Sequence, residues 1–374
     1  MRSRSPTVRL AVIPGDGVGP EVIGATVPVV EAALRQHGAT LETSELDWGG
    51  ERFLREGSAM PPDAADTVGK FDAVLFGAVG RPDVPDHELV WGLIIRLRQQ
   101  LDLAVNLRPV RAFPGVPTKV RDTDGVDLVI VRENTEGEYV GAGGVAHGGT
   151  GQELGLEVAV HSRPVIERVA HHAFALAARR SGRLCLVTKS NAMRYGYPLW
   201  DRVVREVAEQ HPQVELETAL VDAMAARMIQ APRSLDVILA SNLFGDILSD
   251  LAAVLAGGMG MAPSANIRPE HDVPGIYEPV HGSAPDIAGR GVANPVAAIL
   301  SGALLLEDLG HAAAAEDVRA AVAAAVRDPK HHTADLGGHA STAELASAVL
   351  QIVESSAEAT ASGVGREPGR TSGL

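Results

Sequence analysis

The chain has 374 residues, of which 45% are hydrophobic and 21% are charged, and its formal net charge is −14. This balance is typical of a soluble α/β protein of two domains, or of one elaborated domain, with a core of its own. Lys and Arg are scattered, which excludes the basic surface of a nucleic-acid-binding protein, and no apolar run reaches the roughly 18 to 20 residues of a membrane-spanning helix.

Strand-like and helical segments alternate through the first hundred residues. The opening segment MRSRSPTVRL lacks the apolar stretch of a secretion signal, and the chain's one cysteine, Cys185, leaves no disulfide framework, so we expect a cytoplasmic protein. Residues 8–15 (VRLAVIPG) and 72–80 (DAVLFGAVG) have the composition of strands, and helical patterns follow at 20–38 and 87–101. This alternation predicts parallel strands joined by helices.

The segment GDGVGPE after the first predicted strand looks like a dinucleotide-binding fingerprint. Pro20 stands where that motif needs a glycine, and a lone match of this kind is weak evidence. A usual Rossmann fold is therefore not indicated.

The middle of the chain has short β-branched runs at 127–134, 155–162, 183–190 and 235–242. Between the first two lies the glycine-rich segment GAGGVAHGGTGQ, which is too flexible for a core. We predict a protruding arm near residues 140–158. Residues 355–374 lack large apolar groups to bury and are predicted to be a disordered tail.

Basic residues stand beside the strand-like segments. Arg98 and Arg108 flank the run AVNL, and Arg132 ends an apolar strand. Arginines at strand ends can bind carboxylates through two parallel hydrogen bonds, which suits a di- or tricarboxylic substrate, although each alone is also typical of a surface ion pair. Tyr139 and Lys189 could transfer protons if desolvation lowered their pKa values, although tyrosines and lysines usually lie on the surface without such a role.

Asp246 and Asp250 lie four residues apart in the apolar run LASNLFGDILSDLAAVLAGGMG. On a helix they share one face with β-carbons about 5–6 Å apart, so their carboxylates repel each other. Asp246 could cap the helix, whereas Asp250 lies a turn further in. Mg²⁺ or Mn²⁺ prefers carboxylate oxygens and would turn this repulsion into a binding site. Asp222 could supply a third carboxylate, or cap the helix that follows it.

Taken together, these segments resemble the decarboxylating β-hydroxyacid dehydrogenases, the family of isocitrate, 3-isopropylmalate and tartrate/D-malate dehydrogenases. The resemblance rests on IPGDGVGPEV, NLRPVR, VRENTEGEY, TKSNAM, VDAMA, SNLFGDILSD and EPVHGSAPDIAGRGVANP, which follow in order between about residues 8 and 354. It implies an α/β fold of the isocitrate/isopropylmalate dehydrogenase type with two α/β domains. Residues 1–103 and 257–354 would form a discontinuous cofactor-binding domain, and residues 104–256 a dimerisation and substrate domain.

The resemblance also implies a homodimer whose active sites are shared across the interface, with NAD and Mg²⁺ or Mn²⁺ as cofactors and a small hydroxy acid as substrate. It assigns Arg98, Arg108 and Arg132 to the substrate's carboxylates. The metal would be bound by Asp246 and Asp250 of one subunit and by Asp222 of the other. Proton transfer would fall to Tyr139, Lys189 and Asp222.

The coenzyme would bind along YEPVHGSAPDIAGRGVANP, where small residues allow close backbone approach. The resemblance places the cofactor-binding positions at Glu278, His281, Gly282, Ser283, Ala284, Asp286 and Asn294. A carboxylate at Asp286 can accept hydrogen bonds from a ribose 2′-hydroxyl but repels a 2′-phosphate, which favours NAD⁺ over NADP⁺.

In this family the helix before Arg98 contacts the group at C3 of the substrate. Gly92 stands where isocitrate enzymes carry a serine, which disfavours isocitrate. Trp91 stands where isopropylmalate enzymes carry an acidic residue, and its indole leaves less room for an isopropyl group, although Ile94 and Ile95 would still suit one. We therefore expect D-malate, giving pyruvate and CO₂, or tartrate. The alternatives are 3-isopropylmalate, a specialised biosynthetic hydroxy acid, and a catalytically silent regulatory subunit.

Overall fold

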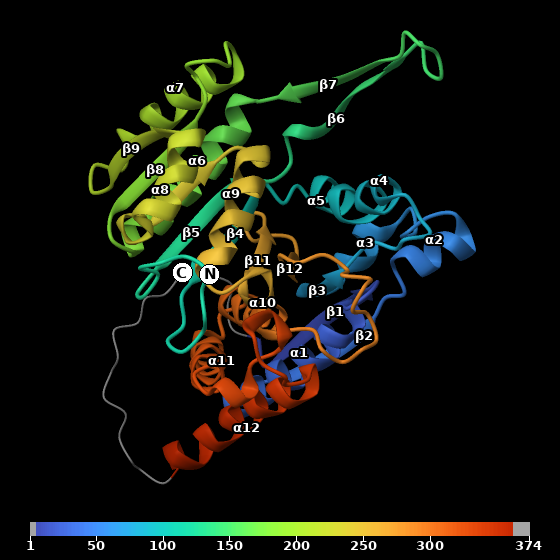
Figure 1. Ribbon diagram of the computed structural model, residues 1–374, viewed down its shortest axis with the longest axis vertical. Coiled ribbons are helices and arrows are strands. Elements are labelled where there is room, and N and C mark those ends of the chain that lie inside the picture. Colours follow the sequence, from blue (N-terminus) through green and yellow to red (C-terminus); the bar gives the residue numbers. More distant parts are fainter. Residues whose placement is uncertain (1–4, 362–374) are drawn as a thin grey trace.

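One mixed sheet of ten strands runs through the molecule in the order β2-β1-β3-β12-β11-β4-β5-β10-β8-β9 (Figure 1). The structure is a computed structural model that describes residues 5–361. The strands of the sheet are β1 (Thr7–Gly15), β2 (Thr40–Glu45), β3 (Ala73–Ala78), β4 (Val105–Arg111), β5 (Asp127–Glu133), β8 (Arg183–Thr188), β9 (Glu215–Leu220), β10 (Val237–Ala240), β11 (Pro263–Ile267) and β12 (Gly275–Pro279).

The strand directions divide the sheet into two parallel parts with an antiparallel centre. β1, β2, β3 and β12 are parallel at one end, and β5, β10, β8 and β9 are parallel at the other. In the centre, β11 and β4 are each antiparallel to both of their neighbours. This order confirms the predicted α/β fold and differs from a usual Rossmann sheet. The domain boundaries at 103/104 and 256/257 stay a prediction.

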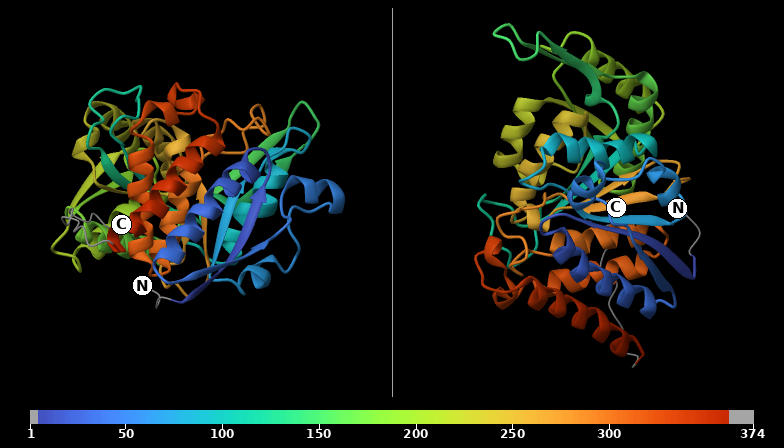
Figure 2. Two further views of the ribbon diagram at one scale, coloured as in Figure 1. Left: turned by 90° about the horizontal axis from the view of Figure 1, so that it is seen from below. Right: turned by 90° about the vertical axis from the view of Figure 1, so that its right-hand side faces the viewer.

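Helices surround both parts of the sheet (Figures 1 and 2). Those grouped beside β1 are α1 (Gly19–Gln36), α10 (Val296–Asp308), α11 (Ala312–Ala325) and α12 (Thr342–Ala361). The same part of the sheet also carries α2 (Gly50–Glu56), α3 (Ala64–Val68), α4 (Asp86–Leu89), a π-helix (Val90–Ile95) and α5 (Arg96–Gln100). Around the other part lie α6 (Arg163–Arg179), α7 (Gly196–Ala208), α8 (Val221–Gln230) and α9 (Asn242–Leu255).

Alternating side chains on β1 supply two cores. Leu10 and Val12 belong to the core shared with α1 and α10, whereas Ala11 and Ile13 belong to a second core with α3 and α5. Successive side chains of a strand point to opposite faces, so a strand covered on both sides has a continuous apolar sequence. Within residues 5–361 we find no helix whose length and hydropathy would suit a membrane span.

A hairpin of β6 (Gly137–Ala146) and β7 (Leu154–Val160) projects from the body of the molecule (Figure 1). The glycine-rich segment interpreted as too flexible for a core lies on this hairpin and is in part a strand, because β6 continues to Ala146. A Cβ at position 143 would lie 2.0 Å from the carbonyl oxygen of Leu156, so glycine there permits close strand pairing.

The disordered tail predicted from residue 355 overlaps the end of α12. α12 continues to Ala361, because a segment without large apolar groups can extend a helix that is already formed. The rest of the predicted tail, residues 362–374, lies outside the described residues.

Candidate active site

Asp246 is the meeting point of three side chains from three different strands. Its Oδ1 forms an ion pair with Arg132 on β5 and lies 3.3 Å from Nη1 of Arg108 on β4. Its Oδ2 accepts a hydrogen bond from the Tyr139 hydroxyl on β6 at 3.0 Å. α9 begins at Asn242, so Asp246 lies inside the helix and does not cap it. A carboxylate, two guanidinium groups and a phenol thus converge at one point.

Asp250 faces the same cluster from the next turn of α9. Its Oδ1 lies 3.6 Å from Nη1 of Arg108, the nitrogen that also approaches Asp246. Within the chain this arginine therefore offsets the predicted repulsion between the two carboxylates. The Asp250 side chain is 53% exposed and that of Arg108 only 8%, so the cluster is open to a ligand on the Asp250 side.

Burial and neighbouring charges set the ionisation of the cluster. Burial acts to raise the pKa of Asp246, but Arg132 and Arg108 outweigh it and hold the pKa below its ordinary value. Burial raises the pKa of Asp250, with Arg108 opposing the shift. Burial and the adjacent Asp246 raise the pKa of Tyr139 to about 12, so the phenol keeps its proton at neutral pH.

Neutral side chains hold the two buried arginines in place. Arg108 donates from Nε to Oδ1 of Asn106 at 2.7 Å and from Nη1 to Oγ of Ser249 at 2.6 Å. Arg132 donates from Nε and Nη2 to Oδ1 of Asn242, at 3.0 and 2.8 Å. Sequence reasoning missed these partners. Their spacing in the sequence could have indicated them. Asn106 lies on the same strand face as Arg108, and Asn242 lies on the same helix face as Asp246.

Arg98 lies in α5, within the helical pattern predicted for residues 87–101. Its Nη2 donates to Oε1 of Glu278 at 2.7 Å, and the same oxygen accepts from the Asn266 amide at 2.7 Å. Glu278 is buried at the end of β12 against this arginine. Its assignment to the cofactor stays a prediction.

The other predicted cofactor residues follow β12. The exposed Gly282 and Asp286 lie on a loop with part-buried His281 and Ala284, and Ala284 has a φ of +40°, a strained value for a residue with a Cβ. Within the described residues, Nε2 of His281 is buried without a hydrogen-bond partner. An orphaned polar atom and local strain both fit a ligand-binding loop.

Hydrogen bonds join this loop to the rest of the molecule. The buried Ser283 accepts a hydrogen bond from the Val18 amide at 2.8 Å, and a Cβ at Gly17 would lie 1.9 Å from the same carbonyl oxygen. The glycine-rich GDGVGPE segment therefore packs against the loop. The side chain of Asn294 is engaged by Asp335 at 3.0 Å and by the Val296 amide at 3.0 Å.

Lys189 and Asp222 form an ion pair with each other at the end of β8 and the start of α8. Asp222 lies in the first turn of α8 and not at its cap position. Among the described residues, neither side chain has an ion pair or hydrogen bond with Asp246 or Asp250. No three His, Cys, Asp or Glu side chains of residues 5–361 gather as a metal site within one chain. The site shared between two subunits stays a prediction.

The predicted C3 pocket residues lie on the π-helix. Trp91 is part-exposed, and its indole packs on β6, where a Cβ at Gly141 would lie 2.8 Å from the ring. A hydrogen bond of 3.4 Å from Gln99 to the Tyr139 carbonyl holds α5 to the same strand. Ile94 is buried in the core beneath the helix and Ile95 packs against that core, so their contact with substrate stays a prediction.

A family model described as isocitrate/isopropylmalate dehydrogenase matches residues 9–349. The chain belongs to this family. It is a decarboxylating dehydrogenase that acts on a hydroxy acid.

Relatives in the family are named for several different substrates. The chain is 46% identical to a probable tartrate dehydrogenase/decarboxylase of Agrobacterium vitis, over 93% of this chain and 98% of that protein. It is 46% identical to the 3-isopropylmalate dehydrogenase of Thermobifida fusca, over 93% and 98%. It is 41% identical to the decarboxylating D-malate dehydrogenase of Escherichia coli, over 93% and 99%. The crystal structure of isocitrate dehydrogenase from Methylococcus capsulatus superposes with a TM-score of 0.84 at 34% identity, covering 93% of this chain and 99% of that one.

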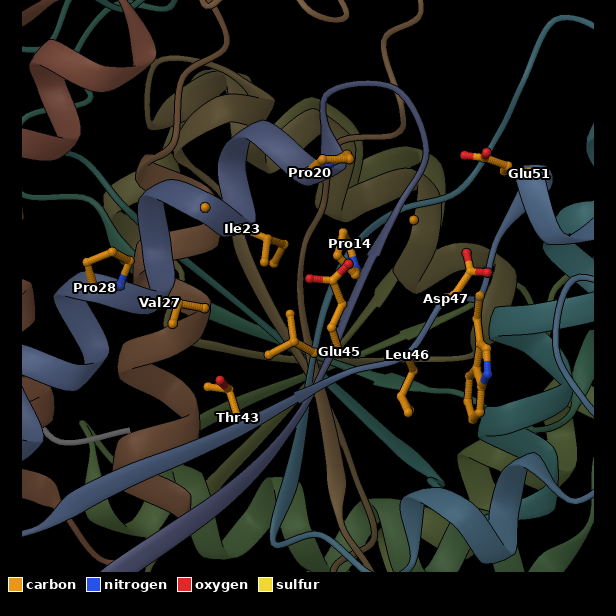
Figure 3. A pocket seen from close by; sticks show the side chains of 14 residues that line it. Pro14, Pro20, Ile23, Val27, Pro28, Thr43, Glu45, Leu46, Asp47 and Glu51 are labelled. Atoms are coloured by element: carbon orange, nitrogen blue, oxygen red, sulfur yellow. The ribbon is translucent and has the colours of Figure 1, made fainter.

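A separate groove of about 510 Å³ lies between α1 and the β1–β2 edge of the ten-stranded sheet (Figure 3). Ile23 and Val27 of α1 line one side, and Glu45, Asp47 and Glu51 contribute carboxylates. None of the predicted site residues lines it, so the groove is not part of the cluster around Asp246.

Proposed function

We propose that the chain catalyses the NAD-dependent oxidative decarboxylation of D-malate to pyruvate and CO₂, or of tartrate, with Mg²⁺ or Mn²⁺. The observation that carries this proposal is the convergence of Arg108, Arg132 and Tyr139 on Asp246, with Asp250 beside them. The tartrate and D-malate dehydrogenases among the relatives support the choice of substrate.

The donor set around Asp246 fits a hard divalent cation. Oδ1 of Asp246 and Oδ1 of Asp250 both lie within 3.6 Å of one arginine nitrogen, so the two carboxylates point to a common region. Asp222 of the partner subunit would complete the ligand set. A bound ion supplies electrophilic polarisation of the substrate's 2-hydroxyl, and NAD⁺ supplies the hydride acceptor.

The protein's own side chains bind the substrate and move its protons. Arg98, Arg108 and Arg132 bind the two carboxylates and fix the orientation of C2. The partner's Lys189, beside the partner's Asp222, accepts the proton of the 2-hydroxyl as hydride leaves C2.

Decarboxylation then breaks the bond between C3 and the carboxylate carbon, and the electron pair enters the enolate of the product keto acid. Tyr139 donates its hydroxyl proton to C3. The raised pKa of Tyr139, which burial takes to about 12, keeps this proton in place until the carbanion forms.

The second candidate substrate is 3-isopropylmalate. It is favoured by the relative from Thermobifida fusca, whose identity to this chain is as high as that of the tartrate enzyme. The indole of Trp91 argues against 3-isopropylmalate, because it fills space beside Gly141 near the start of the arm. A catalytically silent subunit is disfavoured, because the side chains assigned to proton transfer and to the metal are all present.

NADH formation with Mg²⁺ or Mn²⁺ should be measured on D-malate, tartrate, 3-isopropylmalate and isocitrate. We expect the highest kcat/KM for D-malate or tartrate. Trp91→Glu should lower the ratio of D-malate to 3-isopropylmalate activity, and Trp91→Phe should keep it. An unmoved ratio would refute the pocket assignment, and no turnover on any of the four acids would favour the silent subunit.

A further inference from the structure

We propose that Asn242 and Asn106 are positioning residues, which hold Arg132 and Arg108 through uncharged acceptors and so add no further negative charge where the substrate's carboxylates bind. This inference rests on the proposed function, because it takes the substrate to carry the carboxylates that these arginines bind.

Asn242 holds Arg132 from the side that faces away from Asp246. Its Oδ1 accepts from Nε and Nη2 at 3.0 and 2.8 Å, which leaves Nη1 directed to Asp246. Asn242 is 2% exposed and Arg132 likewise 2%, so water does not compete for these bonds. The guanidinium group is therefore held on one side by an uncharged acceptor and on the other by the carboxylate of Asp246.

Asn106 holds Arg108 in the same way. Its Oδ1 accepts from Nε at 2.7 Å, while Nη1 donates to the Ser249 hydroxyl and faces both Asp246 and Asp250. The amide of Asn106 is itself fixed, because its Nδ2 donates to Oγ of Ser264 at 2.7 Å and to Oδ1 of Asn266 at 3.0 Å.

Among the described residues, a part-buried arginine outside the site is bound by two carboxylates and by no side-chain amide. Arg180, remote from the site, donates to Asp236 and Asp127, each at 2.7 Å, and its charge is thereby compensated. Carboxylates in place of Asn242 and Asn106 would add to the charge compensation that Asp246 and Asp250 already give the two site arginines. They would also repel the incoming substrate carboxylate at short range in a buried site, where like charges are costly.

Asn242 makes a second hydrogen bond, and a test must distinguish the loss of this bond from the effect of an added charge. Its Nδ2 donates to the carbonyl oxygen of Glu136 at 2.8 Å and so fastens the turn that leads to Tyr139. Neither Asp nor Ser has this amide group, and only Asp adds a negative charge, whereas Ser keeps a neutral hydroxyl. Asn242→Asp and Asn242→Ser therefore form a matched pair.

The test compares full-length wild type, Asn242→Asp and Asn242→Ser by calorimetric titration with D-malate in the presence of Mg²⁺ and without NAD⁺, and by steady-state kinetics. We expect the Asp variant to bind the hydroxy acid about tenfold more weakly than the Ser variant, with the same order in KM. The KM for NAD⁺ should stay within about twofold in all three proteins, because the arginines do not bind the coenzyme. Equal or tighter binding by the Asp variant would overturn the inference.

Asn106→Asp and Asn106→Ser repeat the comparison at Arg108, on β4 instead of α9. If thermal unfolding shows that the variants at position 242 do not fold, the variants at position 106 test the inference in their place. A fall in stability with equal binding by Asp and Ser would mean that the asparagines are structural only. Failure of the proposed function is separate, since it appears as absent turnover by the wild type on the four-acid panel.

Discussion

One carboxylate on the loop after β12 is expected to set the coenzyme preference. Asp286 is exposed, so it can meet a ribose without rearrangement of the core. Asp286→Lys replaces an acceptor for the 2′-hydroxyl by a cation that attracts a 2′-phosphate. We expect the ratio of kcat/KM for NAD⁺ to that for NADP⁺ to fall by about tenfold or more, the effect of one charged contact. Equal ratios in variant and wild type would contradict the assignment.

At this scale the sequence predicted charged residues better than their neutral partners. Asp246, Arg108, Arg132 and Tyr139, all singled out from the sequence, lie in contact with one another, and their roles stay predictions. A charged residue in an apolar run needs a partner, and few are within reach. Asn242 could not be assigned in the same way, since an asparagine before an apolar helix is also an ordinary capping residue.

At the scale of helices, His172 of α6 is expected to make the stability of the fold depend on pH. Burial lowers the pKa of His172 to about 4, with Arg179 and His271 acting in the same direction. Between pH 6.5 and 4 the unfolded chain binds a proton there and the folded chain does not, so stability falls as the pH falls. By pH 4 the loss is at most about 3 kcal/mol.

His172→Gln should therefore flatten the dependence of the free energy of unfolding on pH between 6.5 and 4. Chemical denaturation at several pH values measures this, and the exposed His339 offers a matched control as His339→Gln. If the pH dependence of the free energy of unfolding stayed as in wild type in His172→Gln but flattened in His339→Gln, the prediction for His172 would be contradicted.

The arm formed by β6 and β7 shows what a sequence pattern can predict about a single element. Its glycines suggested mobility, yet close pairing with β7 makes Gly143 part of a strand. Composition could not distinguish the two, because glycine serves both flexible loops and close backbone approach. The β-branched run at 155–162 was the better guide, because it coincides with most of β7.

Leu154, Leu156 and Val158 share one face of β7 and are 60%, 58% and 41% exposed. Such an apolar row on a projecting hairpin fits the interface of the proposed homodimer. Leu156→Glu should shift the protein towards monomer in sedimentation experiments and lower its activity, because each site would lose its partner. Glu157→Gln, on the opposite face, is the control. Dimers of unchanged stability in Leu156→Glu would exclude this face from the interface.

For the whole molecule, the sequence indicated alternating strands and helices but not that one sheet would join both predicted domains. The central β11–β4 pairing connects residues 263–267 with residues 105–111. Pairing between strands so distant in the chain depends on tertiary packing, and local periodicity carries no information about it. The same limit applies to Lys189 and Asp222, whose predicted site lies beyond a single chain.

Complementation between subunits tests that shared site directly. Lys189→Ala and Asp246→Asn should each abolish activity alone. In a heterodimer of the two variants, one site combines an intact Asp246 with an intact Lys189, and the other site carries both substitutions. With random pairing half the dimers are mixed, so co-expression should restore about a quarter of wild-type activity. A mixture as inactive as its components, despite heterodimers verified by two affinity tags, would place both residues in the site of one chain and remove the basis for a shared metal.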